Sequence, residues 1–462
     1  MAELSVAHRA VLAQMLERVP DRVLKTLSKA VAKMPGEKAR ALSAMLADEA
    51  DDRRRRAIVF APLLPMFQRR PDGVESLNFP PAVLPRLWKA ASSREPELLS
   101  ALDDYRPIDD NPRMRAVANR ICIAAAAAIR DQADIIWPPE GAEPEARLEA
   151  LAEMALCFDL ATLARRGLLT LPDLILRPTP DQLAELRLLI RDSAEVTADG
   201  GPRMLEIMFA HLGDASLILR LVVQSSKASN KEGFLSESEM AGFVNRLIAE
   251  VEARVGRIAA FKPGGKEDPG PGLRADIAWC AETLSELDVT LQLDPHGSWG
   301  TQAREARERI NRTLSAVLRS VDKGLDPIMP TKKVQTTGRM SRQAPDLDVQ
   351  VPNEAVQAAV VLLIVVGAVR GAAQTFGCET QRYQLVQAVL ERITAYAEQV
   401  IDAVNAGASP DARRSLALAE TLAKCLLLIG ETEAGRTIRR RAASAGARPN
   451  AQTTHEASPR AA

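Results

Sequence analysis

Apolar residues recur three and four positions apart along most of this chain, which is the spacing of one face of an α-helix. Residues 143–167 show the pattern clearly, with acidic side chains at the start. The shared apolar face consists of Leu148, Leu151, Ala155 and Phe158. Arg165, Arg166 and Gly167 follow, and basic residues and glycine are typical of a helix end. The pattern therefore predicts one amphipathic helix over 143–167.

Residues at the ends of other segments support further helices. Thr179 precedes Pro180, and Gln182 stands three residues after Thr179. This is the order of a capping box with proline at the first helical position. A long amphipathic helix is predicted after Ser298 or Thr301. Its apolar face consists of Ala303, Ala306, Ile310, Leu314, Val317, Val321 and Leu325.

The most apolar segment, residues 355–369, reads AVQAAVVLLIVVGAV. Gln357 interrupts it and Arg370 ends it, so the run is shorter than the roughly 20 apolar residues that a bilayer-spanning helix needs. A helix that is apolar on every side is typical of the interior of a bundle. We therefore predict a helix buried on all sides and no transmembrane segment.

Proline, glycine and polar residues divide the chain. The segment KPGGKEDPGPG, residues 262–272, predicts a surface loop. The next polar segment is proline-rich and locally basic, which predicts an exposed linker. The final residues lack periodicity and predict a disordered tail. The expected organisation is a proline-interrupted helical region over 1–140, a long-helix region over 141–321, a linker over 322–352, a C-terminal helical bundle over 353–441 and a tail over 442–462.

Composition favours an all-α fold. Aromatic residues make up only 3% of the 462 residues, and the frequent Ala, Leu, Arg and Glu favour helix over β-sheet. A chain of this length exceeds one ordinary core. We predict several helical-bundle or irregular stacked-helix subdomains without a significant β-sheet. Lys plus Arg and Asp plus Glu both number 60, so no overall charge directs the protein to nucleic acid or to an anionic membrane.

The cysteines indicate a reducing compartment. All five are widely spaced, and each lies in or beside an apolar helical pattern, as core thiols do. They are Cys122, Cys157, Cys280, Cys378 and Cys425. The N-terminal residues carry periodic charges and lack the apolar run of a secretory signal. We expect a cytoplasmic protein, and the Ala, Arg and Pro usage suggests a bacterial source with a GC-rich genome.

Neighbouring residues do not form a recognisable metal or phosphate site. The four histidines are dispersed and no Cys-x-x-Cys occurs, which excludes a zinc site built from adjacent ligands. Around Gly265 and Lys266, the first glycine and the final hydroxyl of a Walker loop are missing. We expect neither a metal nor a cofactor.

Paired acidic residues in residues 103–110 offer a second metal hypothesis, because some all-α enzymes bind magnesium through acidic helix faces. Pro107 breaks this segment, so its acids do not lie one turn apart on a continuous helix. Helix capping by Asp109 or Asp110 is the favoured interpretation.

A loop at residues 293–299 carries the residues most typical of catalysis. Asp294 and His296 stand beside Ser298 and Trp299, and Cys280 lies 16 residues before His296. A turn in which Ser298 caps the next helix explains the loop, and a core position explains the cysteine. The favoured interpretation of the loop is therefore structural.

A cluster of arginines near the C-terminus has few compensating acids. Its members are Arg436, Arg439, Arg440 and Arg441. They are our candidate contacts with a polyanion or a partner protein. The competing explanation is favourable charge at the end of a helix.

These observations favour binding over catalysis. We predict a non-catalytic helical scaffold, adaptor or regulatory interaction protein that has a protein partner. Two alternatives stay open: an all-α enzyme whose site is assembled from distant residues, and a nucleic-acid-associated factor that uses the C-terminal arginines. Homo-oligomer formation is compatible with each hypothesis.

Overall fold

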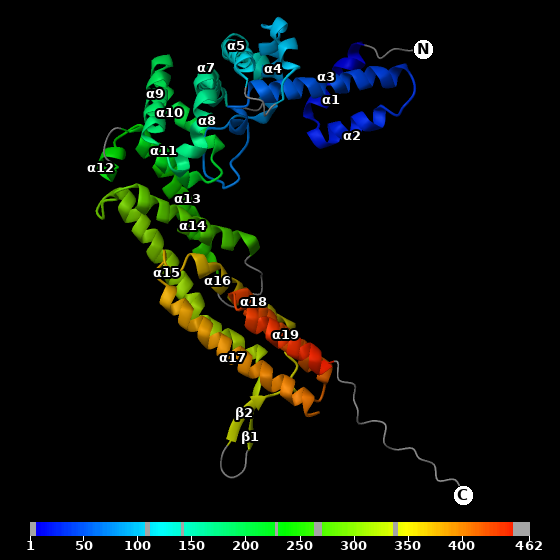
Figure 1. Cartoon of the computed structure of the whole chain (residues 1–462), viewed down its shortest axis with the longest axis vertical. Helices are drawn as coiled ribbons and strands as arrows, with labels where there is room; N and C mark the ends of the chain where they lie inside the picture. Colours follow the sequence, from blue (N-terminus) through cyan, green and yellow to red (C-terminus); the bar gives the residue numbers. More distant parts are fainter. Residues whose placement is uncertain are drawn as a thin grey trace. The chain divides into compact units, whose positions relative to one another are not determined.

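The computed structural model describes residues 6–106, 111–139, 143–226, 230–262, 270–335 and 341–446. The chain divides into two compact units, Met1–Arg246 and Leu247–Ala462. In the described ranges, regular structure is helical apart from one two-stranded sheet (Figure 1). The prediction of an all-α fold is therefore confirmed. The division between the units coincides with none of the boundaries predicted from the sequence.

The N-terminal unit consists of α-helices and short 3₁₀ turns. Its helices are α1 (Val6–Arg18), α2 (Asp21–Val31), α3 (Glu37–Val59), α4 (Leu84–Ser92), α5 (Pro112–Asp131), α6 (Ala133–Ile136), α7 (Pro144–Asp159), α8 (Ala161–Leu176), α9 (Pro180–Val196), α10 (Gly200–His211), α11 (Ile218–Ser225), α12 (Glu232–Leu235) and the first part of α13 (Ala241–Ala260). The 3₁₀ turns are η1 (Leu64–Phe67), η2 (Pro81–Val83), η3 (Pro96–Leu98), η4 (Ser100–Leu102) and η5 (Ala215–Leu217). Prolines start several of these elements, as their fixed φ favours.

Aromatic packing joins three helices of the N-terminal unit. Phe60, at the end of α3, meets Trp88 of α4 and Phe158 of α7 edge-on, with ring centroids 5.7 and 4.9 Å away. The buried Arg165 of α8 donates a hydrogen bond to the carbonyl oxygen of Val59. The last carbonyls of a helix lack intrahelical donors, so this arginine satisfies one of them.

The single helix predicted over 143–167 is instead two helices. α7 ends at Asp159 and α8 begins at Ala161. Leu160 at the break is fully buried, so tertiary packing sets this boundary where local propensity would continue the helix. Gly167 and the arginines before it consequently lie inside α8 rather than at a helix end.

The C-terminal unit is a set of long helices with one hairpin. Its elements after α13 are α14 (Gly270–Thr290), α15 (Ser298–Leu325), η6 (Asp326–Ile328), β1 (Thr331–Gln335), β2 (Ser341–Pro345), α16 (Asn353–Ala368), η7 (Val369–Gly371), α17 (Glu379–Asn405), α18 (Ala412–Ile429) and α19 (Thr432–Gly446). The long helix predicted after residue 298 is present as α15. The loop predicted over 262–272 ends earlier, because residues 270–272 belong to α14, while residues 263–269 lie outside the described ranges.

α16 is only partly enclosed, whereas the sequence predicted a helix buried on all sides: 39% of the apolar segment is buried. It packs against α15 and α18, and none of its large apolar side chains is exposed. In the described chain, Asn353–Gly371 is the one segment long and apolar enough to cross a membrane by length and composition. The core helix of a helical bundle has the same composition. The contacts with α15 and α18 cover part of α16, and its remaining apolar side chains are half-buried.

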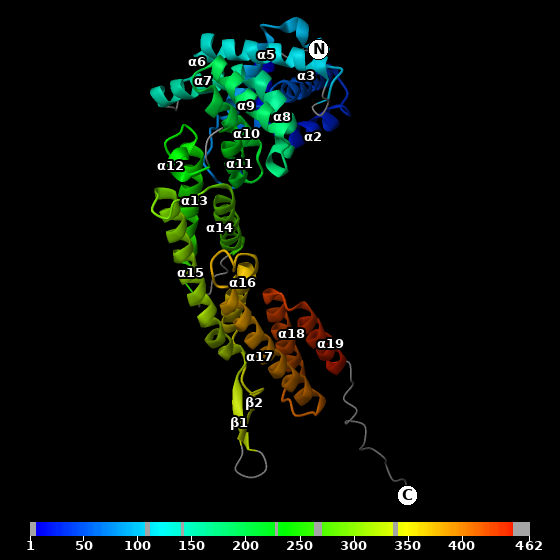
Figure 2. The ribbon, with the colours of Figure 1, turned by 60° about the vertical axis from the view of Figure 1, so that its left-hand side comes forward.

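Residues 322–352 form part of the C-terminal unit rather than a linker between domains. β1 and β2 pair antiparallel, with Thr331 opposite Pro345, and the strands extend beyond the ends of the helices (Figure 2). At the base, the hydroxyl of Tyr396 donates to the carbonyl of Pro330 at 2.8 Å, and Arg414 donates to the carbonyl of Leu347 at 2.5 Å. Local sequence could not indicate these partners, because Tyr396 lies on α17 and Arg414 on α18, far along the chain.

The predicted C-terminal tail begins later than residue 442. α19 continues to Gly446, and Ala442 and Ala445 are buried. These small side chains pack on the neighbouring helix, which extends the helical structure past the last arginines. The rest of the predicted tail, residues 447–462, lies outside the described ranges.

Candidate functional site

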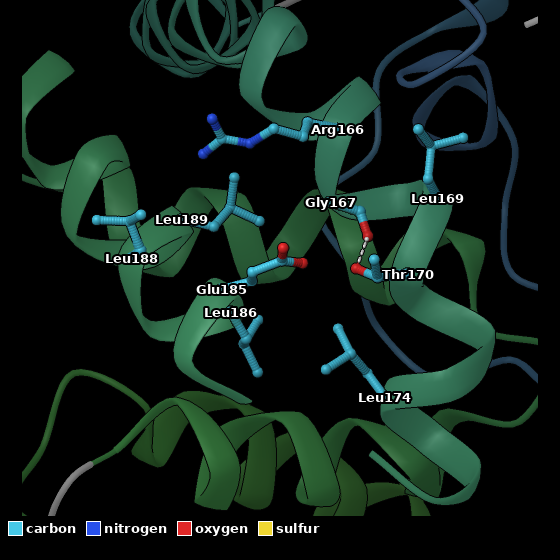
Figure 3. A pocket seen from close by; sticks show the side chains of 9 residues that line it. All are labelled: Arg166, Gly167, Leu169, Thr170, Leu174, Glu185, Leu186, Leu188 and Leu189. Carbon is cyan, nitrogen blue, oxygen red and sulfur yellow. Dashed lines mark hydrogen bonds between the residues drawn. The ribbon is translucent and has the colours of Figure 1, made fainter. Parts of the chain in front are cut away.

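A groove that is open to solvent lies between α8 and α9 in the N-terminal unit. Its volume is about 280 Å³. The lining residues are Arg166, Gly167, Leu169, Thr170, Leu174, Glu185, Leu186, Leu188 and Leu189. Figure 3 shows Arg166 at one end of this set, Leu174 and Leu186 at the other, and Glu185 between them. We call this surface the α8–α9 groove.

The buried leucines form the base of the groove, and two others remain in contact with water. Leu174, Leu186 and Leu189 are buried, whereas Leu169 is 52% exposed and Leu188 is 43% exposed. A partner that covered these two side chains would remove their apolar surface from water. Each Å² of apolar surface buried in this way stabilises the association by about 25 cal/mol. The rim of the groove is therefore suited to an apolar ligand.

Local sequence fixes the corner between the two helices. The hydroxyl of Thr179 accepts from the backbone N–H of Gln182, and the side chain of Gln182 accepts from the N–H of Thr179. The predicted capping box is thus confirmed. The same Gln182 amide donates to Asp173 of α8 at 2.9 Å, which ties the start of α9 to α8.

Gly167 of α8 leaves the space that a leucine side chain of α9 occupies. A Cβ at this position would lie 2.4 Å from the Cδ2 of Leu189, which is shorter than a normal contact between carbon atoms. Only the absence of a side chain at Gly167 leaves Leu189 in its present place at the base of the groove.

Two of the polar side chains that line the groove make polar contacts within the protein, whereas the carboxylate of a third makes no ion pair in the described ranges. Arg166 pairs with Asp192 at 3.3 Å, and the hydroxyl of Thr170 donates to the carbonyl of Gly167 at 3.1 Å. The exposed carboxylate of Glu185 has no ion pair within 4.0 Å in the ranges that the structure describes. An apolar group accompanied by a cation would complement this arrangement.

Sequence reasoning missed the groove, although one signal was available. From Leu168 to Leu176, α8 carries six large aliphatic residues that surround more than one face. A helix on the surface of a unit needs only one apolar stripe for its own core. The additional apolar residues indicated that α8 makes a second contact. They did not identify α9 as the other side of the groove.

The arginines predicted as contacts all lie exposed on α19. Arg441 pairs with Glu398 of α17 at 2.5 Å, and Arg436 pairs with Glu433 at 3.3 Å. No acid lies within 4.0 Å of Arg439 or Arg440 in the described chain. The helix therefore divides the predicted cluster: Arg441 is held by α17, while the other three arginines share the outer face.

The loop at residues 293–299 is organised as a turn. The carboxylate of Asp294 accepts from the backbone N–H of His296 at 2.9 Å, and Trp299 is buried. Gly297 is the residue that caps α15, so the predicted cap at Ser298 is wrong by one position. Gly297 has the extended backbone conformation of an N-cap residue, with φ −72° and ψ 166°, and no side chain caps the helix.

The thiol considered for catalysis is poorly suited to act as a nucleophile. Cys280 is buried in α14, and burial raises the pKa of its thiol to about 12. The reactive form of cysteine is the thiolate. The core position predicted for Cys280 is confirmed.

The acidic side chain at residue 103 is paired with two arginine side chains. Asp103 accepts from Arg54 at 2.7 Å and from Arg55 at 2.8 Å, and the Arg55 guanidinium lowers the pKa of this carboxyl group. Asp109 and Asp110 lie outside the described ranges. Within those ranges, no three His, Cys, Asp or Glu residues are grouped as metal ligands would be.

Comparison with models of protein families, with curated proteins and with solved structures found no match to this chain. The groove, the outer face of α19 and the loop before α15 are therefore interpreted from their own geometry.

Proposed function

We propose that this protein is a non-catalytic helical adaptor that binds a partner protein through the α8–α9 groove. The observation that carries the proposal is the open cavity whose base consists of buried leucines and whose rim exposes Leu169 and Leu188. A protein interface gains most of its affinity from a few side chains buried in such pockets.

The geometry favours a particular ligand chemistry. A volume of about 280 Å³ is slightly below the range of about 300–1,000 Å³ for small-molecule sites and suits inserted side chains from a peptide. The carboxylate of Glu185 favours a basic residue close to the inserted apolar side chain. The proposed partner segment is therefore a helix or peptide that presents leucine- or phenylalanine-like residues beside lysine or arginine.

Selection from a peptide-display library on the purified full-length chain tests this proposal. The selected peptides should combine an apolar residue with a basic one. The double variant Leu169→Glu, Leu188→Glu should weaken their binding by about 10-fold or more, since a charge at the rim disfavours burial. Leu176→Glu is the matched control, because Leu176 is exposed on α8 and does not line the groove.

Equal binding to the wild type and the double variant would contradict the groove as the binding site. Failure to select any peptide that prefers the wild type would contradict the proposal as a whole. Circular dichroism of each variant establishes that the helices are retained.

A polyanion-binding role is the second candidate, and the outer face of α19 favours it. Arg436, Arg439 and Arg440 lie on this face, and two of them have no acidic partner nearby in the described chain. Binding of duplex DNA that weakens steeply with salt, and weakens further in Arg439→Gln, Arg440→Gln, would support this role.

We also propose a cytoplasmic location. All five cysteines are buried free thiols, and thiols stay reduced in the cytoplasm. Measurement of the thiol content of the protein isolated from its native cells, under conditions that trap thiols, tests this location.

A further inference from the structure

α2 has a line of apolar side chains that the fold leaves in contact with water. Val23 is 45% exposed and Leu27 is 38% exposed. Ala30 is also exposed, and Met34, 61% exposed, follows in the turn after the helix. These residues are spaced by four, three and four positions, which is the spacing of the seam between two paired helices.

This line is distinct from the face that α2 uses in its own fold. Leu24 and Val31 are buried in a small core with Leu16 of α1 and Leu46 of α3. α2 thus carries two neighbouring apolar faces. Only one of them is required by its packing on α3.

The charges beside the exposed line are positive and uncompensated. Asp21 pairs with Arg53 at 2.5 Å, and Glu17 of α1 pairs with Lys89, so both nearby acids are already engaged. The exposed cations of α2 and its following turn are Arg22, Lys25, Lys29 and Lys33. None of them has an acid within 4.0 Å in the part of the chain that the structure describes.

On an ideal helix, these cations follow the exposed apolar line on the side away from α3. A residue advances 100° around a helix of 3.6 residues per turn. Leu24 and Val31 therefore border the line on one side. Thr26 and Lys33 border it on the other, and Arg22 and Lys29 follow next around the helix. A ligand on this surface would meet apolar side chains next to a single rim of positive charge.

We infer that α2 pairs with an acidic amphipathic helix of a partner protein. Such a helix would cover Val23 and Leu27 with its apolar seam and place glutamate or aspartate beside Lys29 and Lys33. A second copy of α2 is disfavoured as the occupant, because its cations would face like charges. The inference rests on the proposed adaptor function and adds a second binding surface to it, separate from the α8–α9 groove.

The probe is a synthetic helical peptide of about three heptads, with leucine at both seam positions and glutamate at the flanking positions. A matched peptide carries lysine at the flanking positions. Fluorescence anisotropy measures the binding of each peptide to the full-length chain. The wild type should bind the acidic peptide, and its affinity for the basic peptide should be lower by about 10-fold or more.

Two variants test the two features of the surface. Lys29→Glu, Lys33→Glu should weaken the binding of the acidic peptide by about 10-fold or more and strengthen the binding of the basic peptide. Val23→Ser, Leu27→Ser should weaken both peptides. Arg413→Glu, Lys424→Glu makes the same charge change at two exposed positions of α18 and should have no effect on the binding of either peptide.

Several outcomes would overturn the inference. Equal binding of the two peptides, or unchanged binding in the Lys29 and Lys33 variant, would show that α2 is not the site. Binding to vesicles of phosphatidylserine and phosphatidylcholine without binding to the acidic peptide would assign the surface to an anionic membrane instead.

The groove variant separates this inference from the proposed function. Leu169→Glu, Leu188→Glu should leave the acidic peptide bound as in the wild type. Loss of the peptide in this variant, with retention in the α2 variants, would refute the α2 site and leave the groove proposal intact.

Discussion

Gly367 of α16 lies against the carbonyl oxygen of Leu428 of α18, so close that a Cβ at Gly367 would stand 2.2 Å from that oxygen. No side chain can occupy this space unless the two helix backbones separate. The glycine therefore fixes how the apolar core helix meets α18. It also explains why a residue that disfavours helix stands inside α16.

Gly367→Ala should lower the free energy of unfolding by about 1–3 kcal/mol, the range for an overpacked core. The gain of about 1 kcal/mol that alanine brings to a helix offsets only part of the loss. Thermal unfolding followed by circular dichroism measures the change. Gly256→Ala in α13 is the matched control, because nothing lies within 4 Å of its Cβ position. Its midpoint should stay constant or rise, and an equal response of the two variants would contradict the close-contact argument.

For the hairpin we expect a different result of limited proteolysis from the one that an interdomain linker would give. Lys333 of β1 and Arg342 of β2 are exposed, so limited trypsin digestion should cut there. The two products should nevertheless elute together under native conditions, because the base of the hairpin is bonded to α17 and α18. They should separate in denaturant. Separation of folded products without denaturant would support an interdomain linker instead.

Local signals in the sequence predicted those features that depend on neighbouring residues. Thr179 and Gln182 form the predicted cap, and the carboxylate of Asp294 holds the predicted turn before α15. Each of these depends on a few adjacent positions whose geometry the residue types restrict. The helical form of the apolar segment was also predicted, but its burial on every side was not found, because 39% of the segment is buried.

Features that depend on distant partners could not be predicted in this way. The hairpin is held by Tyr396, which lies 66 positions from Pro330, and a polar composition alone resembles a linker. The exposure of Leu169 and Leu188 likewise depends on which apolar residues other helices cover. Amphipathic spacing indicates that a residue can be buried, but not what buries it.

The cysteines should resist alkylation in the folded protein. Burial raises the pKa of Cys122 and of Cys425 to about 11, and the thiolate is the reactive form. Iodoacetamide at about pH 8 should leave the intact mass of the native chain unchanged, whereas all five thiols should react in guanidinium. Rapid native modification of any cysteine would contradict its buried position.

His211 should make the N-terminal unit less stable in mild acid. Burial lowers the pKa of this imidazole below its ordinary value of 6.5, although the hydrogen bond between its Nε2 and the carbonyl of Pro62, 2.8 Å long, opposes the shift. The unfolded chain therefore binds a proton at a higher pH than the folded chain. The stability that neutral His211 contributes is complete above about pH 6.5 and is lost progressively as the pH falls below it, by at most about 1.4 kcal/mol per pH unit.

Denaturant unfolding of the wild type and of His211→Gln between about pH 7 and pH 5 measures this contribution. Glutamine keeps an N–H donor for the carbonyl of Pro62 but does not titrate, so the variant should lose less stability over this range. The difference between the two proteins isolates the imidazole of His211 from the carboxyl groups, which titrate at lower pH. An identical pH dependence of stability in the wild type and His211→Gln would therefore contradict a depressed pKa of His211.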